Sequence, residues 1–424
     1  MTSDHLRYEL ASATLDNGLS VVVSPDSGAP GVAVNLWVEV GSADEVAGRT
    51  GFAHLFEHLM FQGSSRVASG EHMATIEAVG GTVNATTSSD RTNYFETVPR
   101  GALDLALWLE ADRFASLAIT PENFEAQRQV VKEEKRQRYD NQPYGDLLQL
   151  LTAQHFAPEH PYGHLTIGSM ADLDEASLGD VAGFFDAWYR AGNVRLVLCG
   201  PVTPDEGLAL AERHFGALPR REKPSRAAMP AGGLLAPRST VVRRDVPHSL
   251  AYLSWALPPA AHPDHPALSL ALSVLADGSS SRLHRALVRR GDLAHEVHGA
   301  ALTNRSSSSV ATILGRPAET AGTDQLAAAI LAELDDFVAG GPTDEELSRA
   351  AAQYERDWLW ELATVGGRAD AINESWLLFG APDRVNTHLA EVLAVTADDV
   401  RAAAARWLAP DSAHQLHYLA EDAR

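Results

Sequence analysis

A stretch rich in proline, glycine and basic residues lies near the middle of the chain and divides it into two parts of similar length. Between Gly216 and Thr240, prolines and glycines occur among arginine, lysine and serine. Such a composition disfavours regular helices and strands and is typical of a linker between domains. Because one hydrophobic core rarely serves a chain of 424 residues, we predict two domains, residues 1–217 and 241–424, joined by a linker over 218–240.

Strand and helix signals alternate along the first half. Asn17-Gly18 lies between apolar runs and predicts a β-hairpin. Thr120-Pro121 predicts the start of a helix, because threonine is a good cap and proline fits the first helical turn. Hydrophobic periodicity predicts further strands near residues 31–40, 82–87 and 93–98, and helices over 51–61, 103–117 and 120–139.

The second half repeats this pattern. Val34–Trp37 and Tyr252–Trp255 each read as a strand ending in tryptophan, and each precedes an expected helix and a Gly-Ser pair. Aligning the two glycines, Gly63 and Gly278, places three residues that bind no metal, Ser269, Leu272 and Ser273, opposite His54, Glu57 and His58. We therefore predict an α+β fold: two homologous domains, each a mainly antiparallel sheet covered by helices, with chemistry retained only in the first.

Composition and charge exclude several classes of function. The 56 acidic and 34 basic side chains give a net charge of −22, which argues against nucleic acid or an anionic membrane as the partner. No apolar run is long enough to predict a membrane span, and the N-terminus shows no signal peptide. The single cysteine, Cys199, lies in an apolar run and is expected to be a buried thiol. We expect a cytoplasmic location.

The segment His54-Leu-Phe-Glu57-His58 carries the clearest chemical signal. Residues four apart on a helix lie on one face, so His54 and His58 can offer imidazole nitrogens to one metal ion, and Glu57 projects to the same side. A catalytic zinc site keeps one position open for water, whose proton an adjacent carboxylate can accept. The order His-x-x-Glu-His is that of the inverzincins. Because the neighbouring residues are apolar, these polar groups should be buried together, and a metal would satisfy them.

A third protein ligand is expected in the helix that follows Pro121. The apolar residues Val130 and Val131 mark the inward face of that helix, and Glu134 lies four and three positions after them. Glu133 is rotated by about 100° from Glu134. Because a charged run over residues 132–138 also fits a solvated helix, spacing alone leaves Glu133 and Glu134 open as the third ligand.

Several segments together resemble the pitrilysin/insulysin family of zinc metallopeptidases. The similarity is greatest to its short branch, which resembles the mitochondrial processing peptidase and bacterial counterparts. It covers nearly the whole chain. Besides the His-x-x-Glu-His motif, it rests on Gly80–Ala85, Glu110–Arg113, Gln127–Glu134, Ser279–His284 and Leu293–Val297.

The resemblance implies which residues form the site. In the family, a glutamate well beyond the second histidine is the third ligand, and Glu134 takes that place. We therefore expect one zinc ion per chain, held by His54, His58 and Glu134, with Glu57 activating a water molecule. The family has another glutamate where this chain has Gln127, and this departure should alter the support of the site or its rate.

The resemblance also implies that an extended peptide binds beside the metal as an added strand. The receiving region corresponds to Thr82–Thr87, where Asn84, Ala85 and Thr86 are expected to contact the substrate. Asn84 is the candidate to hold the peptide backbone, and a purely local role at a strand edge is the alternative. Glu110 and Asp112 could orient a ligand histidine, or could form ordinary pairs on a helix surface.

The family further suggests a dimer whose halves enclose a chamber. In some members an arginine and a tyrosine from a second-half domain hold the substrate carbonyl, but the corresponding stretch Thr303–Gly315 contains no tyrosine. Two partners stay open: a homologous subunit that lacks the zinc motif, or a second copy of this chain.

The function predicted from these features is that of a zinc metalloendopeptidase that hydrolyses short or unfolded polypeptides. The alternative is a non-catalytic subunit that binds peptides or holds an assembly together. Family members of that kind typically lose part of the His-x-x-Glu-His motif, which is intact here. A structural zinc site is disfavoured, because such sites have four ligands rich in cysteine.

Overall fold

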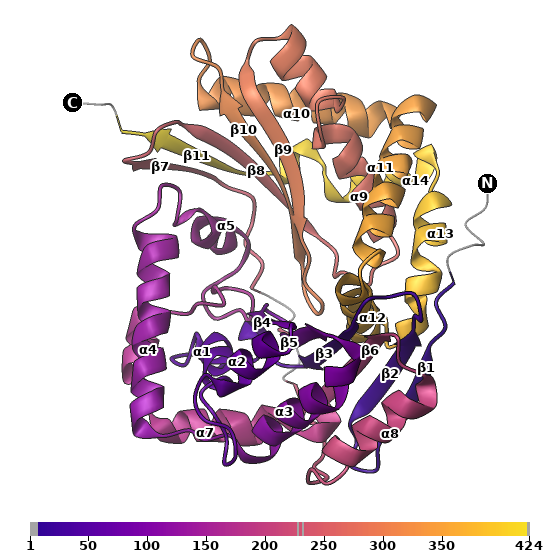
Figure 1. Ribbon diagram of the computed structural model, residues 1–424. Helices are drawn as coiled ribbons and strands as arrows, with labels where there is room; N and C mark the ends of the chain where they lie inside the picture. Colours follow the sequence, from indigo (N-terminus) through magenta and orange to yellow (C-terminus); the bar gives the residue numbers. More distant parts are fainter. Residues whose placement is uncertain (1–6, 227–228, 231–232, 422–424) are drawn as a thin grey trace. The chain divides into compact units, whose positions relative to one another are not determined.

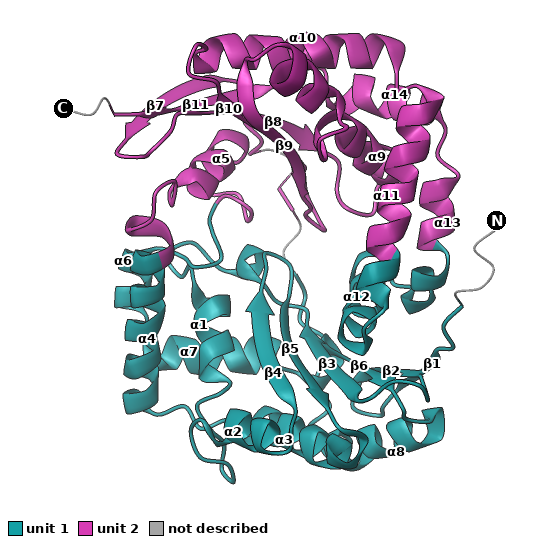
Figure 2. Cartoon of the chain, turned by 45° about the horizontal axis from the view of Figure 1, so that its top comes forward, with its two compact units in different colours: residues 1–137, 164–228, 359–387 teal, residues 138–163, 229–358, 388–424 magenta. Residues whose placement is uncertain are grey.

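The computed structural model describes residues 7–226, 229–230 and 233–421 (Figure 1). Residues 227–228 and 231–232 of the expected linker therefore lie outside the described residues. The described chain forms two compact units (Figure 2): residues 7–137, 164–226 and 359–387 belong to unit 1, and residues 138–163, 229–230, 233–358 and 388–421 to unit 2.

Unit 1 contains a six-stranded sheet with the order β1-β2-β6-β3-β5-β4. Neighbouring strands are antiparallel except β2 and β6, which are parallel. The hairpin predicted around Asn17-Gly18 is confirmed, because β1 and β2 pair on either side of it. The strands are β1 (Ala11–Thr14), β2 (Ser20–Pro25), β3 (Val32–Val38), β4 (Thr82–Thr87), β5 (Thr92–Val98) and β6 (Val194–Gly200).

Unit 2 contains a five-stranded sheet with the order β7-β11-β8-β10-β9. Its one parallel pair is β7 and β11. In both halves the five common strands follow one order: first, last, second, fourth, third. This shared topology is what a duplicated α+β unit predicts. The strands are β7 (Ser239–Arg244), β8 (Leu250–Leu257), β9 (Ala294–Leu302), β10 (Ser309–Pro317) and β11 (His414–Ala420).

Helices cover both sheets. The helix that follows the second common strand is α1 in the first half and α9 in the second, as the alignment of the halves predicted. In unit 1 the helices are α1 (Phe52–Leu59), α2 (Glu71–Ala78), α3 (Leu103–Ser116), α4 (Pro121–Lys135), α6 (Met170–Glu175), α7 (Leu178–Trp188), α8 (Pro204–Phe215) and α12 (Val365–Phe379). Unit 2 has α5 (Leu147–His155), α9 (His265–Ala276), α10 (Thr323–Gly340), α13 (His388–Leu393) and α14 (Ala397–Trp407), and α11 (Asp344–Leu362) ends in unit 1.

Two segments depart from the expected contiguous domains 1–217 and 241–424. Residues 359–387, which include α12, pack in unit 1, and residues 138–163, which include α5, pack in unit 2. Within unit 1, α12 lies against β3, β5 and β6. Within unit 2, Leu151 of α5 packs with Leu250, Leu416 and other apolar side chains. Each half of the sequence therefore supplies one helix to the sheet of the other half.

Helices α12 and α5 each cover the second face of a sheet. Strand β3 is buried along its whole length, because α3 packs against it and α12 packs against it too. A strand covered on both faces reads as a nearly continuous apolar run rather than an alternating one, and β3 has this pattern except at Asn35, whose side chain donates a hydrogen bond to Asp370. Cys199 of β6 is buried as predicted, and burial raises the pKa of its thiol to about 11.

Among the residues that the structure describes, none of the helices combines the length and the apolar character needed to cross a bilayer.

The packing of α5 in unit 2 gives a stability prediction. Leu151→Ala should lower the free energy of unfolding by about 2–5 kcal/mol, because it leaves a cavity in a buried cluster. Leu148→Ala on the same helix is the matched control, because Leu148 is exposed, and it should cost under about 1 kcal/mol. Urea unfolding followed by tryptophan fluorescence measures both. Equal losses for the two variants would contradict this packing.

Candidate active site

Helix α1 carries the His-x-x-Glu-His motif and begins at a constrained turn. Gly51, just before the helix, has φ of 90°, and a Cβ atom there would lie 2.8 Å from the carbonyl oxygen of Ile167. Only glycine fits such a position without strain. Five of the eight residues of α1 are buried, so the helix is anchored by its apolar side chains, as its sequence predicted.

A buried carboxylate caps the start of α1. Glu45 accepts hydrogen bonds from the backbone N–H groups of Gly51 (2.9 Å) and Ala53 (2.7 Å), and His164 Nε2 lies 3.0 Å from it. Burial raises the pKa of Glu45, and the His164 contact opposes that rise. Negative charge at a helix N-terminus is stabilising. Glu45 thus fixes the backbone immediately before His54.

Helix α4 supplies the third group of the site. It starts as predicted at Thr120, whose side chain accepts a hydrogen bond from the backbone of Asn123. The prediction that both valines face inward was wrong for one of them: Val131 is fully buried, whereas Val130 is 46% exposed. Glu134 lies one turn after Val131 and shares its face, which is why the inward placement of Glu134 still holds.

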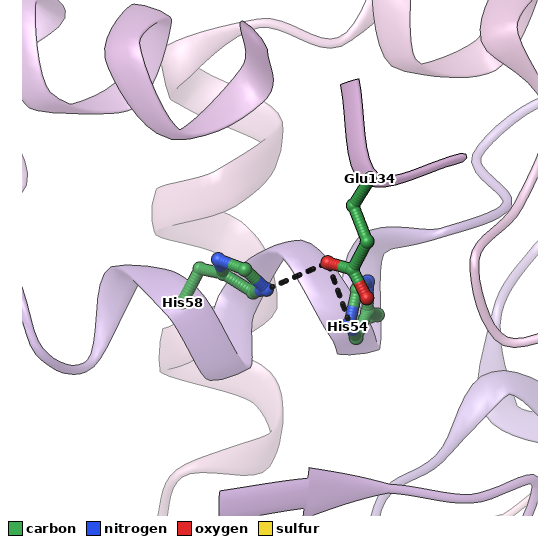
Figure 3. A group of neighbouring side chains, drawn as sticks. All are labelled: His54, His58 and Glu134. Carbon is green, nitrogen blue, oxygen red and sulfur yellow. Dashed lines mark ion pairs between the residues drawn. The ribbon is translucent and has the colours of Figure 1, made fainter. Parts of the chain in front are cut away.

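The structure brings His54, His58 and Glu134 together (Figure 3). Glu134 Oε2 lies 3.4 Å from His58 Nε2 and 3.7 Å from His54 Nε2. The three side chains are 12–23% exposed, so the group is accessible from solvent. Glu133 is exposed and instead pairs with Arg136 at 3.1 Å. Geometry therefore separates the two glutamates that spacing left open.

These three side chains fit a zinc ion. Tetrahedral ligands about 2.1 Å from zinc are separated from one another by about 3.4 Å, close to the 3.4 and 3.7 Å observed. All three candidate ligand atoms lie within 4.8 Å of each other. Two imidazoles and one carboxylate are also a ligand set of catalytic zinc sites, which leave a fourth position open.

Glu57 lies on α1 and is held by a neighbouring strand. Its Oε2 accepts a hydrogen bond from Thr87 Oγ1 of β4 at 2.5 Å. Burial raises the pKa of Glu57, the Thr87 bond and the charge of His58 lower it, and the charge of Glu134 adds to the rise. Together these effects leave the pKa of Glu57 above the usual value for glutamate, which suits a group that alternately accepts and releases a proton.

Acidic groups surround His58. Burial alone would lower the pKa of its imidazole, but hydrogen bonding with Glu134 and the charges of Glu57 and Glu134 outweigh burial and raise it. Gln127, the departure from the family pattern, also hydrogen-bonds with His58. An environment that stabilises a positive charge on His58 would likewise stabilise a cation bound beside it.

The expected substrate-contacting residues lie on β4, which ends the sheet order of unit 1. Asn84 and Thr86 are exposed and Ala85 is buried. The side-chain oxygen of Asn84 accepts a hydrogen bond from the backbone N–H of Ala85 at 2.9 Å, which is a local contact of the kind that the sequence left open. A strand at the end of a sheet presents backbone groups that another strand can pair with.

Glu110 and Asp112 lie in other contacts. Asp112 binds Ser64 and Arg66. Glu110 pairs with Arg113 and lies 3.5 Å from His72 Nε2. The structure thus gives both carboxylates neighbours other than the two motif histidines.

A second group of possible ligands was not predicted. His72, Glu96 and Glu110 come from α2, β5 and α3, all are buried, and their ligand atoms lie within 4.8 Å of one another. Burial raises the pKa of Glu96 and of Glu110 to about 7 and lowers that of His72 to about 4. Because the three residues lie on three different elements, no spacing within one helix or strand could have predicted this group. Arg113 neutralises part of this group, so we interpret it as a buried ion network.

Comparison with known proteins assigns the family. Residues 21–166 match the family model described as insulinase (peptidase family M16), and residues 175–354 match that of the peptidase M16 inactive domain. The chain belongs to peptidase family M16. The model named for an inactive domain covers α9, the helix in which the alignment of the two halves placed Ser269, Leu272 and Ser273 opposite the motif.

Several M16 relatives are named as zinc proteases. The zinc protease PqqE of Helicobacter pylori is 31% identical over 83% of this chain and 80% of its own length. An uncharacterised zinc protease of Mycobacterium tuberculosis is 28% identical over 92% of this chain and 89% of its own. The crystal structure of a protease from Helicobacter pylori superposes with a TM-score of 0.89 and 27% identity, covering 98% of this chain and all of that one.

Proposed function

We propose that this M16 protein is a zinc metalloendopeptidase that cleaves short or unfolded polypeptides, with one zinc ion held by His54, His58 and Glu134. The observation that carries the proposal is the convergence of two imidazoles and one carboxylate at distances that suit a single tetrahedral ion. Glu57 lies on the same helix, one residue before His58, and is the base that such a site requires.

Each residue then has a defined task. A bound zinc ion would supply Lewis-acid activation of water and of the peptide carbonyl. Glu57 takes the proton of the attacking water and returns it to the departing amine, a transfer that its raised pKa favours. Thr87 holds the Glu57 carboxylate in place. The peptide lies along β4 as an added strand, beside Asn84, Ala85 and Thr86.

We further propose that the chain works as a dimer, with a homologous subunit that lacks the zinc motif or with a second copy. The support is the absence of tyrosine from Thr303–Gly315 in the sequence, which leaves the carbonyl-holding pair of the resembled family incomplete.

The role of Glu57 is tested by Glu57→Gln. This change removes the proposed base and keeps the proposed ligands, so kcat should fall about 10²–10⁴-fold while the zinc content is unchanged. Glu77→Gln, an exposed glutamate of α2, is the control and should be fully active. Cleavage of quenched fluorescent peptides gives kcat, and metal analysis of the purified chain gives the zinc content.

The outcomes of the Glu57 experiment separate the candidate functions. A Glu57→Gln variant as active as the wild type would contradict the mechanism. If the wild-type chain binds zinc but cleaves no peptide alone or with added partner subunits, the function is that of a non-catalytic peptide-binding or assembly subunit.

The neighbouring glutamates of α4 test the metal site. Glu134→Gln should weaken zinc binding by more than the about 10–100-fold typical of losing an outer-shell partner, because it removes a direct ligand. Glu133→Gln should bind zinc as the wild type does, since Glu133 is exposed and pairs with Arg136. Competition with a chromogenic zinc chelator measures both affinities. Equal affinities, or a larger loss in Glu133→Gln, would refute the assignment of Glu134.

A further inference from the structure

We propose that Arg91 and Asn93 are positioning residues that hold the β4 edge strand ready for the peptide, and that Asp370 of α12 fixes the orientation of Asn93. This inference rests on the proposed function, because it concerns the strand along which the peptide would lie. It adds a contribution from the second half of the sequence to the site in unit 1.

Thr86 is the residue of β4 on which these contacts converge. Its backbone N–H donates to Asn93 Oδ1 at 3.1 Å, and its hydroxyl donates to the same oxygen at 2.6 Å. Its carbonyl oxygen accepts from Arg91 Nη1 at 2.9 Å. Both backbone polar groups of Thr86 are therefore held by side chains, in addition to the pairing of β4 with β5.

Asn93 can make these contacts in only one orientation of its amide. Asp370 accepts a hydrogen bond from Asn93 Nδ2 at 3.2 Å, and it also accepts from Asn35 Nδ2 and Trp37 Nε1 at 3.0 and 3.1 Å. The indole N–H of Trp37 and the backbone N–H of Thr86 can only donate, so the Asp370 oxygen acts as an acceptor that faces the amide nitrogen of Asn93, and the amide oxygen of Asn93 faces Thr86. Helix α12 thereby determines which atom Asn93 presents to β4.

Arg91, in the turn between β4 and β5, contacts both Thr86 and Asn93. Its guanidinium lies over the ring of Trp37, 4.9 Å from the centroid, and Nη1 also reaches Asn93 Oδ1 at 3.3 Å. The planar guanidinium can stack and donate several hydrogen bonds at once, which a lysine ammonium cannot reproduce. The turn residue and the strand residue thus hold Thr86 together.

The position of Thr86 matters because the next residue, Thr87, donates to Glu57. A peptide that pairs with β4 takes its register from that strand, and a slip of one residue would present the other face of the peptide to the site. A less ordered edge should bind the peptide more weakly and hold it in a less defined register, which raises KM and shifts the cleaved bond. The network therefore links the binding edge to the proposed base.

The test uses the full zinc-loaded chain and a labelled ten-residue peptide that the wild type cleaves. Arg91→Met should raise KM about tenfold and change kcat less than about twofold, because a charge-assisted contact that orders the binding edge is lost. Arg91→Lys should recover part of this loss. Asn93→Ala should act in the same direction, and mass spectrometry should detect products cut at bonds next to the wild-type site.

A binding measurement keeps the inference separate from catalysis. In a Glu57→Gln background, Arg91→Met should weaken binding of the same peptide about tenfold by fluorescence anisotropy, with zinc affinity unchanged. Arg100→Met, an exposed arginine of unit 1 paired with Glu206, is the control and should bind the peptide normally. If the wild type cleaves peptides but Arg91→Met leaves KM, product positions and peptide binding unaltered, the inference is wrong and the proposed function stands. A wild type that cleaves nothing rejects the proposed function itself.

Discussion

The contact of Glu134 with two imidazoles one helical turn apart is the interaction on which the proposed chemistry of this protein depends. His54 and His58 share one face of α1, but a helix alone cannot supply a third group at the right distance. Glu134 reaches them from α4, at 3.4 and 3.7 Å. The site is therefore a property of how two helices of unit 1 pack, and it requires both of them to be fixed.

The surrounding structure supplies that fixation through buried and capped groups. Glu45 binds the backbone at the start of α1. Gly51, just before the helix, has no Cβ atom and can therefore lie close to the carbonyl oxygen of Ile167. Val131 is fully buried one turn before Glu134. Partly buried carboxylates are costly unless they are paired or bind a cation. The pKa of Glu57 and that of His58 are both raised. The site therefore stabilises added positive charge, whether it is a proton or a metal ion.

Local sequence signals predicted the parts of this arrangement that lie within one element. The four-residue spacing of His54 and His58, the cap at Thr120 and the hairpin at Asn17-Gly18 follow from helix and turn geometry, and the structure contains all three features. Spacing did not separate Glu133 from Glu134, because the burial of one face of α4 depends on packing that a charged helix does not reveal. The prediction for Val130 failed for this reason.

Contacts between distant parts of the sequence were not predictable. Asp370 meets Asn93 from 277 positions away, and His164 meets Glu45 from 119 positions away. The placement of α5 in unit 2 and of α12 in unit 1 was not predictable for the same reason. Composition shows where the chain is irregular, but it does not show against which sheet a helix packs. The second half keeps the strand order of the first and lacks its motif. Through α12, it still contributes to the unit that carries the motif.

We propose that one metal ion binds between His54, His58 and Glu134. A crystal structure of the zinc-loaded chain, with anomalous scattering recorded on both sides of the zinc absorption edge, tests it most directly. We expect one strong peak per chain, about 2.0–2.2 Å from both imidazole Nε2 atoms and from the Glu134 carboxylate. A peak at His72, Glu96 and Glu110 instead, or none at the motif, would contradict it.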